Sequence, residues 1–210
     1  MRKIVIFDMD GTLIDSKKDI TISINAVREA NHNLFALSEE FIVEAINMEV
    51  RNLPKLFYET EAYEDRDRIM FEAHYQTQCV QNPYLYDGVK ETLLELKKKG
   101  VKLSVATNAP TQFALTMLSH LEVAHLFDVI IGADKAGASK PDPKMIYEIL
   151  EFYSYDKKDD MAWMVGDNSK DIQSALNANI KSVFATWGFS SHSEHETVIK
   201  YPKDVLNIVL

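Results

Sequence analysis

The architecture expected for this chain follows from the stretch Lys3-Ile4-Val5-Ile6-Phe7-Asp8-Met9-Asp10-Gly11. Its residues 4–7 form a short apolar run with β-branched side chains, which is typical of a buried strand. Asp8 and Asp10 follow where that strand ends, and two neighbouring carboxylates are costly to keep together unless a cation holds them. Gly11 permits the backbone to turn sharply away from the edge of the sheet. In open α/β sheets ligands bind at the carboxyl ends of the strands, so the pair marks a candidate site. Two solvated loop aspartates would leave the same pattern.

The composition is that of an ordinary globular protein. The chain has 210 residues, of which 46% are hydrophobic and 26% are charged, which suits one domain with a sizeable insertion or two small domains. No apolar run reaches the ~20 residues that span a bilayer, and the run after Lys3 is short for a secretory signal. The single Cys79 suits a reducing compartment. We therefore expect a cytoplasmic protein with no membrane contact.

The net charge of −9 argues against a nucleic-acid partner. The notable basic run, Lys97-Lys98-Lys99, falls at the end of a predicted helix, where cations complement the helix dipole. An acidic surface does not steer anions inward from a distance. If the substrate is a phosphate ester, local cations and a bound metal must attract it.

Residues 16–80 have the pattern of a helical bundle and contain no convincing strand. Apolar residues recur at helical spacing in four segments, the third of which starts near Pro54. The residues expected to face inward are Ile20, Ile24, Val27, Phe41, Ile42, Ala45, Ile46, Leu53, Leu56, Phe57, Ile69, Met70, Ala73 and Cys79.

From residue 87 onward, predicted helices and strands alternate. Asp87 is expected to cap a helix that ends at Gly100, and further helices begin near Pro110, Pro143, 168 and 205. Strands are expected at 101–106, 129–132, 161–165 and 182–185. This alternation predicts an α/β, Rossmann-like, doubly wound parallel sheet with a helical cap inserted after the first strand. We expect residues 1–15 and 81–210 to form the core domain and residues 16–80 to form the cap.

Small polar or acidic residues follow separate strands of the predicted sheet. They are Asp8, Asp10, Thr107, Asn108, Asp134 and Asp167. Because parallel strands point the same way, these ends converge on one edge of the sheet, near the loop that carries Lys140. Three carboxylates (Asp8, Asp10 and Asp167) are the ligands that Mg²⁺ prefers, and a hydroxyl, an amide and a lysine suit a phosphate.

Each of these residues also has an ordinary structural interpretation. Thr107 and Asn108 could cap the helix before Pro110, and Lys140 could be a solvated loop lysine. Asp171 could pair with a lysine on its own helix, and Asp134 is expected to be a loop acid. The histidines show no metal-ligand spacing, and we expect His192 and His195 to be solvated. We expect residues 187–189 to form a turn that packs against the rest of the chain.

Four stretches together resemble the ordered motifs of the haloacid dehalogenase superfamily. They are Asp8-Met9-Asp10-Gly11-Thr12-Leu13, Val105-Ala106-Thr107-Asn108, Lys140-Pro141-Asp142-Pro143 and Gly166-Asp167-Asn168-Ser169-Lys170-Asp171. Their order and the helical insertion are similar to the branch of that superfamily with a small helical cap, and the resemblance covers essentially the whole chain.

The resemblance implies roles for three catalytic residues. Asp8 would be the nucleophile that attacks phosphorus and forms an aspartyl-phosphate. Asp10 would protonate the leaving alcohol and then accept a proton from the hydrolytic water. Lys140 would pair with the phosphate and with the Asp8 carboxylate.

The resemblance also implies the binding residues. Thr107 and the neighbourhood of Asn108 would hold phosphate oxygens, while Asp8, the backbone carbonyl of Asp10 and Asp167 would bind Mg²⁺. Asp171 would not bind the metal itself but would orient Lys140 or a metal-bound water.

The second aspartate, Asp10, favours phosphoryl transfer, because cleavage of a carbon–halogen bond needs no acid for an alcohol. The segments 74–89, 166–175 and 185–189 resemble phosphoglycolate phosphatases, so we expect a Mg²⁺-dependent phosphatase of a small phosphorylated metabolite, as monomer or homodimer. The cap stretch 46–51 lacks the glycine-rich turn usual in those enzymes. Arg51 in that stretch could bind a second anionic group of the substrate or could lie on the surface.

Two alternatives stay open. A β-phosphoglucomutase-like enzyme is compatible with Arg51 but lacks the expected cap lysine, since residues 75–79 are Tyr-Gln-Thr-Gln-Cys. A binding protein that has lost catalysis would share the fold, but every reactive position here is filled.

Overall fold

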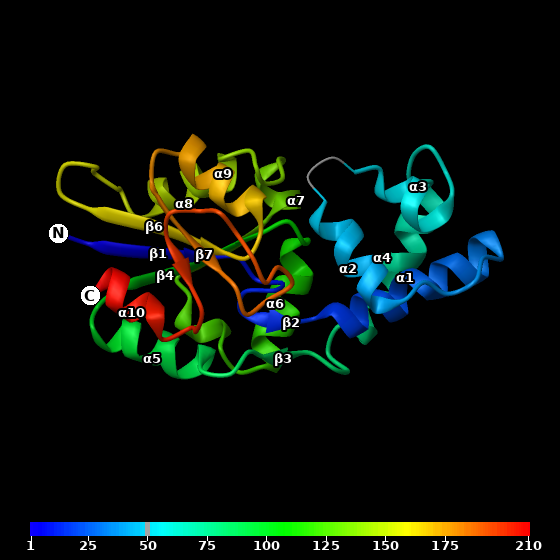
Figure 1. Cartoon of the computed structure of the whole chain (residues 1–210), viewed down its shortest axis with the longest axis horizontal. Helices are drawn as coiled ribbons and strands as arrows, with labels where there is room; N and C mark the ends of the chain where they lie inside the picture. Colours follow the sequence, from blue (N-terminus) through cyan, green and yellow to red (C-terminus); the bar gives the residue numbers. More distant parts are fainter. Residues whose placement is uncertain (49–50) are drawn as a thin grey trace. The chain divides into compact units, whose positions relative to one another are not determined.

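The computed structural model describes residues 1–48 and 51–210, which form two compact units. The first unit comprises residues 1–15 and 85–210, and the second comprises residues 16–84. Figure 1 shows the chain, coloured along the sequence. Within the described ranges, no helix combines the length and apolar character that crossing a bilayer requires.

A six-stranded sheet organises the first unit, and all of its strand pairs are parallel. Its order is β5-β4-β1-β6-β7-β8, so the first strand of the chain is central. The bounds are β1 (Lys3–Phe7), β4 (Lys102–Thr107), β5 (Val129–Gly132), β6 (Met161–Gly166), β7 (Lys181–Ala185) and β8 (Val198–Ile199). Ile4, Val5 and Ile6 of β1 are completely buried, because helices cover both faces of the strand.

Helices cover the two faces of this sheet, as Figure 1 shows. One face carries α8 (Lys144–Phe152) and α9 (Ser169–Asn177), and the opposite face carries α5 (Val89–Lys98) and α10 (Asp204–Val209). The remaining helices of this unit are α6 (Thr111–His120), α7 (Ala133–Ala136) and the short 3₁₀ helix η1 (Ala124–Leu126). Ile146 and Ile149 of α8 pack against Ile4 and Ile6 of β1 in one buried cluster. The predicted doubly wound parallel sheet is therefore confirmed.

The second unit is helical, as its apolar spacing predicts. Its helices are α1 (Lys17–His32), α2 (Glu39–Asn47), α3 (Leu53–Tyr58) and α4 (Asp65–Gln78). Val27, Ile42, Ala45 and Phe57 form its buried core. Two short strands, β2 (Ile14–Asp15) and β3 (Tyr84–Leu85), pair where the chain passes from one unit to the other.

Several local expectations are wrong. Ile69, Phe41 and Ala73 were expected to face inward, but all three are exposed. Helix α4 buries Asp67 and Tyr75 instead, because polar contacts rather than apolar spacing select its inward face. Helix α5 is capped by Gly88 in a left-handed conformation and not by Asp87. His195 is half-buried, with its Nε2 3.1 Å from the Ser182 hydroxyl. The pattern also gave no sign of β8, which has two residues.

Candidate active site

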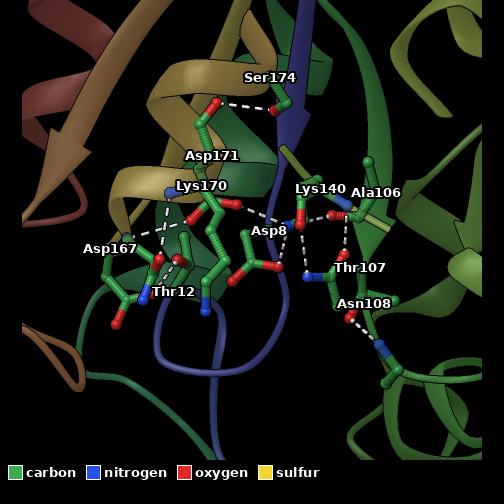
Figure 2. Close-up of polar contacts among 12 residues, drawn as sticks. Asp8, Thr12, Ala106, Thr107, Asn108, Lys140, Asp167, Lys170, Asp171 and Ser174 are labelled. Carbon is green, nitrogen blue, oxygen red and sulfur yellow. Dashed lines mark hydrogen bonds and ion pairs between the residues drawn. The ribbon is translucent and has the colours of Figure 1, made fainter. Parts of the chain in front are cut away.

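The register of the sheet brings the predicted strand-end residues to one level. Phe7, the last residue of β1, pairs with β4 on one side and with β6 on the other, near the carboxyl end of both strands. Asp8 therefore leaves the sheet beside Thr107, which ends β4, and beside Asp167, which follows β6. Figure 2 shows Asp8 between these two residues.

Lys140 lies at the centre of this group although it comes from a loop. Its ammonium is 2.5 Å from Asp8 Oδ1, 2.6 Å from Asp171 Oδ1 and 2.8 Å from the Ala106 carbonyl oxygen. These contacts occupy the three hydrogens of the ammonium. Lys140 is 4% exposed, so the interpretation as a solvated loop lysine is wrong. Burial by itself would lower the pKa of Lys140, but Asp171 and Asp8 outweigh burial and raise it.

Three buried carboxylates, those of Asp8, Asp167 and Asp171, come within reach of one ion, with oxygen atoms within 4.8 Å of one another. The pKa of Asp167 is raised well above its usual value, mainly by burial and to a lesser extent by repulsion from Asp8 and Asp171. Burial also raises the pKa of Asp171, to about 6, against the opposing charge of Lys140. The cluster therefore carries more negative charge than its own lysine balances.

Asp171 is held by its own helix as well as by Lys140. Its Oδ2 accepts a hydrogen bond from the Asn168 N–H at 3.1 Å, and the Asn168 side chain accepts one from the Lys170 N–H, so the two residues form a capping box at the start of α9. The lysine that Asp171 contacts comes from a distant loop rather than from α9, contrary to the helical-pair interpretation.

Asp167 is held by residues that the sequence did not single out for this purpose. Its Oδ1 accepts from the Thr12 hydroxyl at 3.1 Å, and its Oδ2 accepts from the Phe189 N–H at 2.8 Å. Gly188 packs so closely on the first motif that a Cβ there would lie 1.6 Å from the Gly11 carbonyl oxygen. The stretch 187–189 therefore supports the site directly, and the small size of Gly188 was the available signal.

Thr107 and Asn108 do not cap α6. Thr107 is buried and accepts a hydrogen bond from the Ala109 N–H at 3.1 Å, while the Asn108 side chain contacts the Lys140 backbone. The first turn of α6 is bound instead by Asp134, whose Oδ1 accepts from the N–H and the hydroxyl of Thr111, both at 2.8 Å. Burial works to raise the pKa of Asp134, but these hydrogen bonds prevail and lower it. Asp134 is therefore a helix-binding acid and not a free loop acid.

Two further predicted site residues, Asp10 and Arg51, are not among the three clustered carboxylates or the lysine. Asp10 is half-buried in the turn after β1, where it forms a bridge with Ile14. Arg51 belongs to the other compact unit and precedes α3. Its Nη1 is buried and has no hydrogen-bond partner among the described residues, and burial lowers its pKa. Glu49 and Val50, which share the stretch 46–51 with Arg51, lie outside the described residues.

Comparison with known proteins identifies the family. The family model described as haloacid dehalogenase-like hydrolase matches residues 5–185. The chain belongs to this family. A phosphoglycolate phosphatase of Vibrio cholerae is 32% identical over 91% of this chain and 87% of its own length. An N-acetylmuramic acid 6-phosphate phosphatase of Pseudomonas aeruginosa is 27% identical over 99% of this chain and 94% of its own.

The same family emerges from solved structures. The crystal structure of a predicted phosphoglycolate phosphatase from Haemophilus somnus superposes with a TM-score of 0.84 at 26% identity, and covers 99% of this chain and 97% of its own. The resemblance drawn from the four motifs is thereby confirmed, and so is the fold class.

Proposed function

We propose that this hydrolase is a Mg²⁺-dependent phosphatase of small phosphate monoesters that works through a phosphorylated Asp8. The observation that carries the proposal is the contact of a buried lysine with a buried carboxylate: Lys140 Nζ lies 2.5 Å from Asp8 Oδ1. A carboxylate held in this way is restricted to one orientation, which is what a nucleophile needs. The names of the relatives, which are phosphatases, support the same reaction class.

The chemistry of the buried donors fits a divalent cation. Three carboxylates and one ammonium carry a charge of −3 + 1 = −2, which one Mg²⁺ would neutralise. Oxygen ligands are those that Mg²⁺ prefers. Asp8, Asp167 and the backbone carbonyl of Asp10 would hold the ion, while Asp171 would keep its contacts with Lys140 and Asn168 and orient the lysine. When bound, the ion supplies charge neutralisation at the phosphate oxygens.

The first chemical step belongs to Asp8. One carboxylate oxygen attacks phosphorus, an Asp8–phosphorus bond forms, and the bond from phosphorus to the ester oxygen breaks. Lys140 stabilises the charge that moves from the carboxylate to the phosphoryl oxygens, because its ammonium is already in place and need not reorganise. Thr107 and the backbone near Asn108 would donate hydrogen bonds to the same oxygens.

Asp10 would move the protons. In the first step its carboxyl gives a proton to the departing alkoxide, and in the second it takes one from the water that attacks the phosphorylated Asp8. The second step breaks the Asp8–phosphorus bond and releases inorganic phosphate. A dehalogenase has no use for such an acid, so the presence of Asp10 supports phosphoryl transfer.

For the substrate, we propose a small phosphate ester with a second anionic group, of the phosphoglycolate kind. Arg51 would bind that group, because its buried Nη1 has no hydrogen-bond partner among the described residues. A guanidinium pairs with carboxylate through two parallel hydrogen bonds. The name of the Vibrio cholerae relative supports this choice.

The test of the reaction is hydrolysis of p-nitrophenyl phosphate with Mg²⁺. We expect turnover that EDTA abolishes, that Asp8→Asn abolishes, and that Asp159→Asn leaves unchanged, because Asp159 is exposed and away from the cluster. Acid-quenched protein should carry phosphate on Asp8. Robust turnover by Asp8→Asn would refute the nucleophile assignment.

A panel of phosphoglycolate, hexose phosphates, nucleotides and pyrophosphate tests the substrate. Arg51→Ala should lower kcat/KM for the doubly anionic substrate roughly 10- to 100-fold and leave p-nitrophenyl phosphate unaffected. Arg66→Ala, on the exposed surface of α4, is the matched control. Interconversion of hexose phosphates would favour the mutase alternative, and a folded protein inactive on the whole panel would favour a binding protein.

A further inference from the structure

The loop that carries Lys140 is attached to the sheet through the side chain of Asn108. Asn108 Oδ1 accepts a hydrogen bond from the Lys140 N–H at 2.7 Å, and Asn108 Nδ2 donates one to the Lys140 carbonyl at 3.2 Å. The carboxamide of Asn108 thus binds both the N–H and the carbonyl of Lys140, as the backbone of a neighbouring strand would (Figure 2). We call this pair of contacts the Asn108 clamp.

Lys140 lies in a segment where such a clamp can matter, because no helix or strand includes it. Lys140 lies between α7, which ends at Ala136, and α8, which begins at Lys144, so neither helix fixes its backbone. Its long side chain reaches Asp8 and Asp171 from this loop. A flexible four-carbon chain does not by itself fix the ammonium. Without a restraint on the Lys140 backbone, the contacts with Asp8 and Asp171 would have to hold both the ammonium and the loop.

Asn108 is suited to this task because its own backbone is fixed. It directly follows Thr107, the last residue of β4, and β4 pairs with the central strand β1 that leads to Asp8. The clamp therefore ties the lysine loop to the strand pair that carries the nucleophile. A second, more exposed contact comes from Asn177, whose Nδ2 donates to the Pro141 carbonyl at 3.1 Å.

We propose that Asn108 is a positioning residue that sets the place of the Lys140 ammonium relative to Asp8. The proposal rests on the proposed function, because it gives Lys140 a task to be positioned for. It assigns the side chain of Asn108 to the enzyme's own backbone, so that any contact of this residue with phosphate falls to its N–H group. Without the clamp, the ammonium is no longer held in register with the Asp8 carboxylate.

Kinetics of single and double variants separate positioning from direct binding. Asn108→Ser, whose side chain is too short to span the Lys140 peptide, should lower kcat for p-nitrophenyl phosphate roughly 10- to 100-fold with a nearly unchanged KM. In a Lys140→Met background, the same change should have little further effect, because no ammonium remains to be positioned. Losses that multiply in the double variant would overturn the proposal, because they would mean that Asn108 acts on the phosphate independently of Lys140.

A readout without turnover keeps the clamp testable if the proposed function fails. Acetic anhydride labelling, followed by peptide mass spectrometry, reports the accessibility of Lys140 relative to the exposed Lys158. Removal of two hydrogen bonds should raise Lys140 labelling roughly tenfold in Asn108→Ser, and Asn207→Ser on α10 should leave it unchanged. Unchanged labelling in Asn108→Ser would overturn the clamp.

A third variant guards against a failure of Asn108→Ser to fold. Asn108→Asp keeps an acceptor for the Lys140 N–H but sets an oxygen against the Lys140 carbonyl, so it should reproduce the loss of kcat and the gain in labelling. Wild-type turnover and wild-type labelling in folded Asn108→Asp would refute the proposal. An inactive wild type with a positive labelling result would reject the phosphatase assignment alone.

Discussion

Gly188→Ala is a small substitution that should damage the active site strongly. A Cβ at this position would lie 1.6 Å from the Gly11 carbonyl oxygen and 2.9 Å from Asp167 Oδ2. Atoms of this kind do not approach closer than about 3.0 Å, so the two backbone segments must separate by at least 3.0 − 1.6 = 1.4 Å. One of these segments carries Asp8 and Asp10, and the other donates the Phe189 N–H to Asp167.

The magnitude follows from this displacement. A misplacement of about 1 Å at a catalytic group can cost about 100-fold in rate, which corresponds to about 2.7 kcal/mol in the activation free energy. Overpacking should also lower the free energy of unfolding by about 1–3 kcal/mol. We therefore expect kcat/KM for p-nitrophenyl phosphate to fall by roughly two orders of magnitude in a protein that still folds.

The assay needs a control that separates strain from displacement. Gly100 has a φ of +78° but open space around its Cα, so Gly100→Ala strains the backbone without a clash. It should lose about 1 kcal/mol of stability and keep wild-type kcat/KM. Urea unfolding and steady-state kinetics on both variants decide the matter. Wild-type kinetics in Gly188→Ala would show that the stretch 187–189 does not position the first motif.

Three further outcomes concern stability. Folding raises the pKa of Asp171 from 3.8 to about 6, so the folded state binds more protons than the unfolded state in this range. The free energy of unfolding in EDTA should therefore fall by about 2 kcal/mol from pH 4 to 7 relative to Asp171→Asn, which urea titrations at each pH would measure. An identical pH dependence in the two proteins would contradict this. Asp134→Ala should destabilise the protein by about 1–2 kcal/mol, because the N–H of Thr111 loses its acceptor, and should leave kcat unchanged. A loss of kcat at unchanged stability would contradict the capping role. Arg28→Met should lower the free energy of unfolding by about 1–3 kcal/mol, because the Phe57 carbonyl loses its hydrogen bond, whereas the exposed Arg66→Met should lower it little. Equal melting temperatures for the two variants would contradict this role of Arg28.

Much of the fold could be predicted because its causes are local. The alternation of apolar strands with amphipathic helices depends on side chains a few residues apart, and it was sufficient to place the long helices and the main strands. The local pattern does not predict which face of a helix is buried when contacts with distant residues decide it. Ile69 has helical spacing but is exposed, because α4 turns Asp67 inward to meet Asn31 and His32.

The candidate site divides in the same way. Asp8, Thr107 and Asp167 could be grouped from the sequence because each lies at the carboxyl end of a parallel strand, and such ends meet at one edge of a sheet. Lys140 could be included in the site because of its motif. Its contacts with Asp8 and Asp171 could not be predicted, because the sequence does not distinguish a buried lysine from one on an exposed loop.

The residue order alone was thus enough for the main strands and the parallel topology, because these follow from periodicity and from chain direction. Only the tertiary structure decided which residues hold the strand-end side chains in place. Gly188 against Gly11, Phe189 on Asp167 and Asn108 on Lys140 join segments far apart in the chain. Such contacts require folded backbones to be placed to within a few tenths of an ångström, and no local sequence pattern encodes that placement.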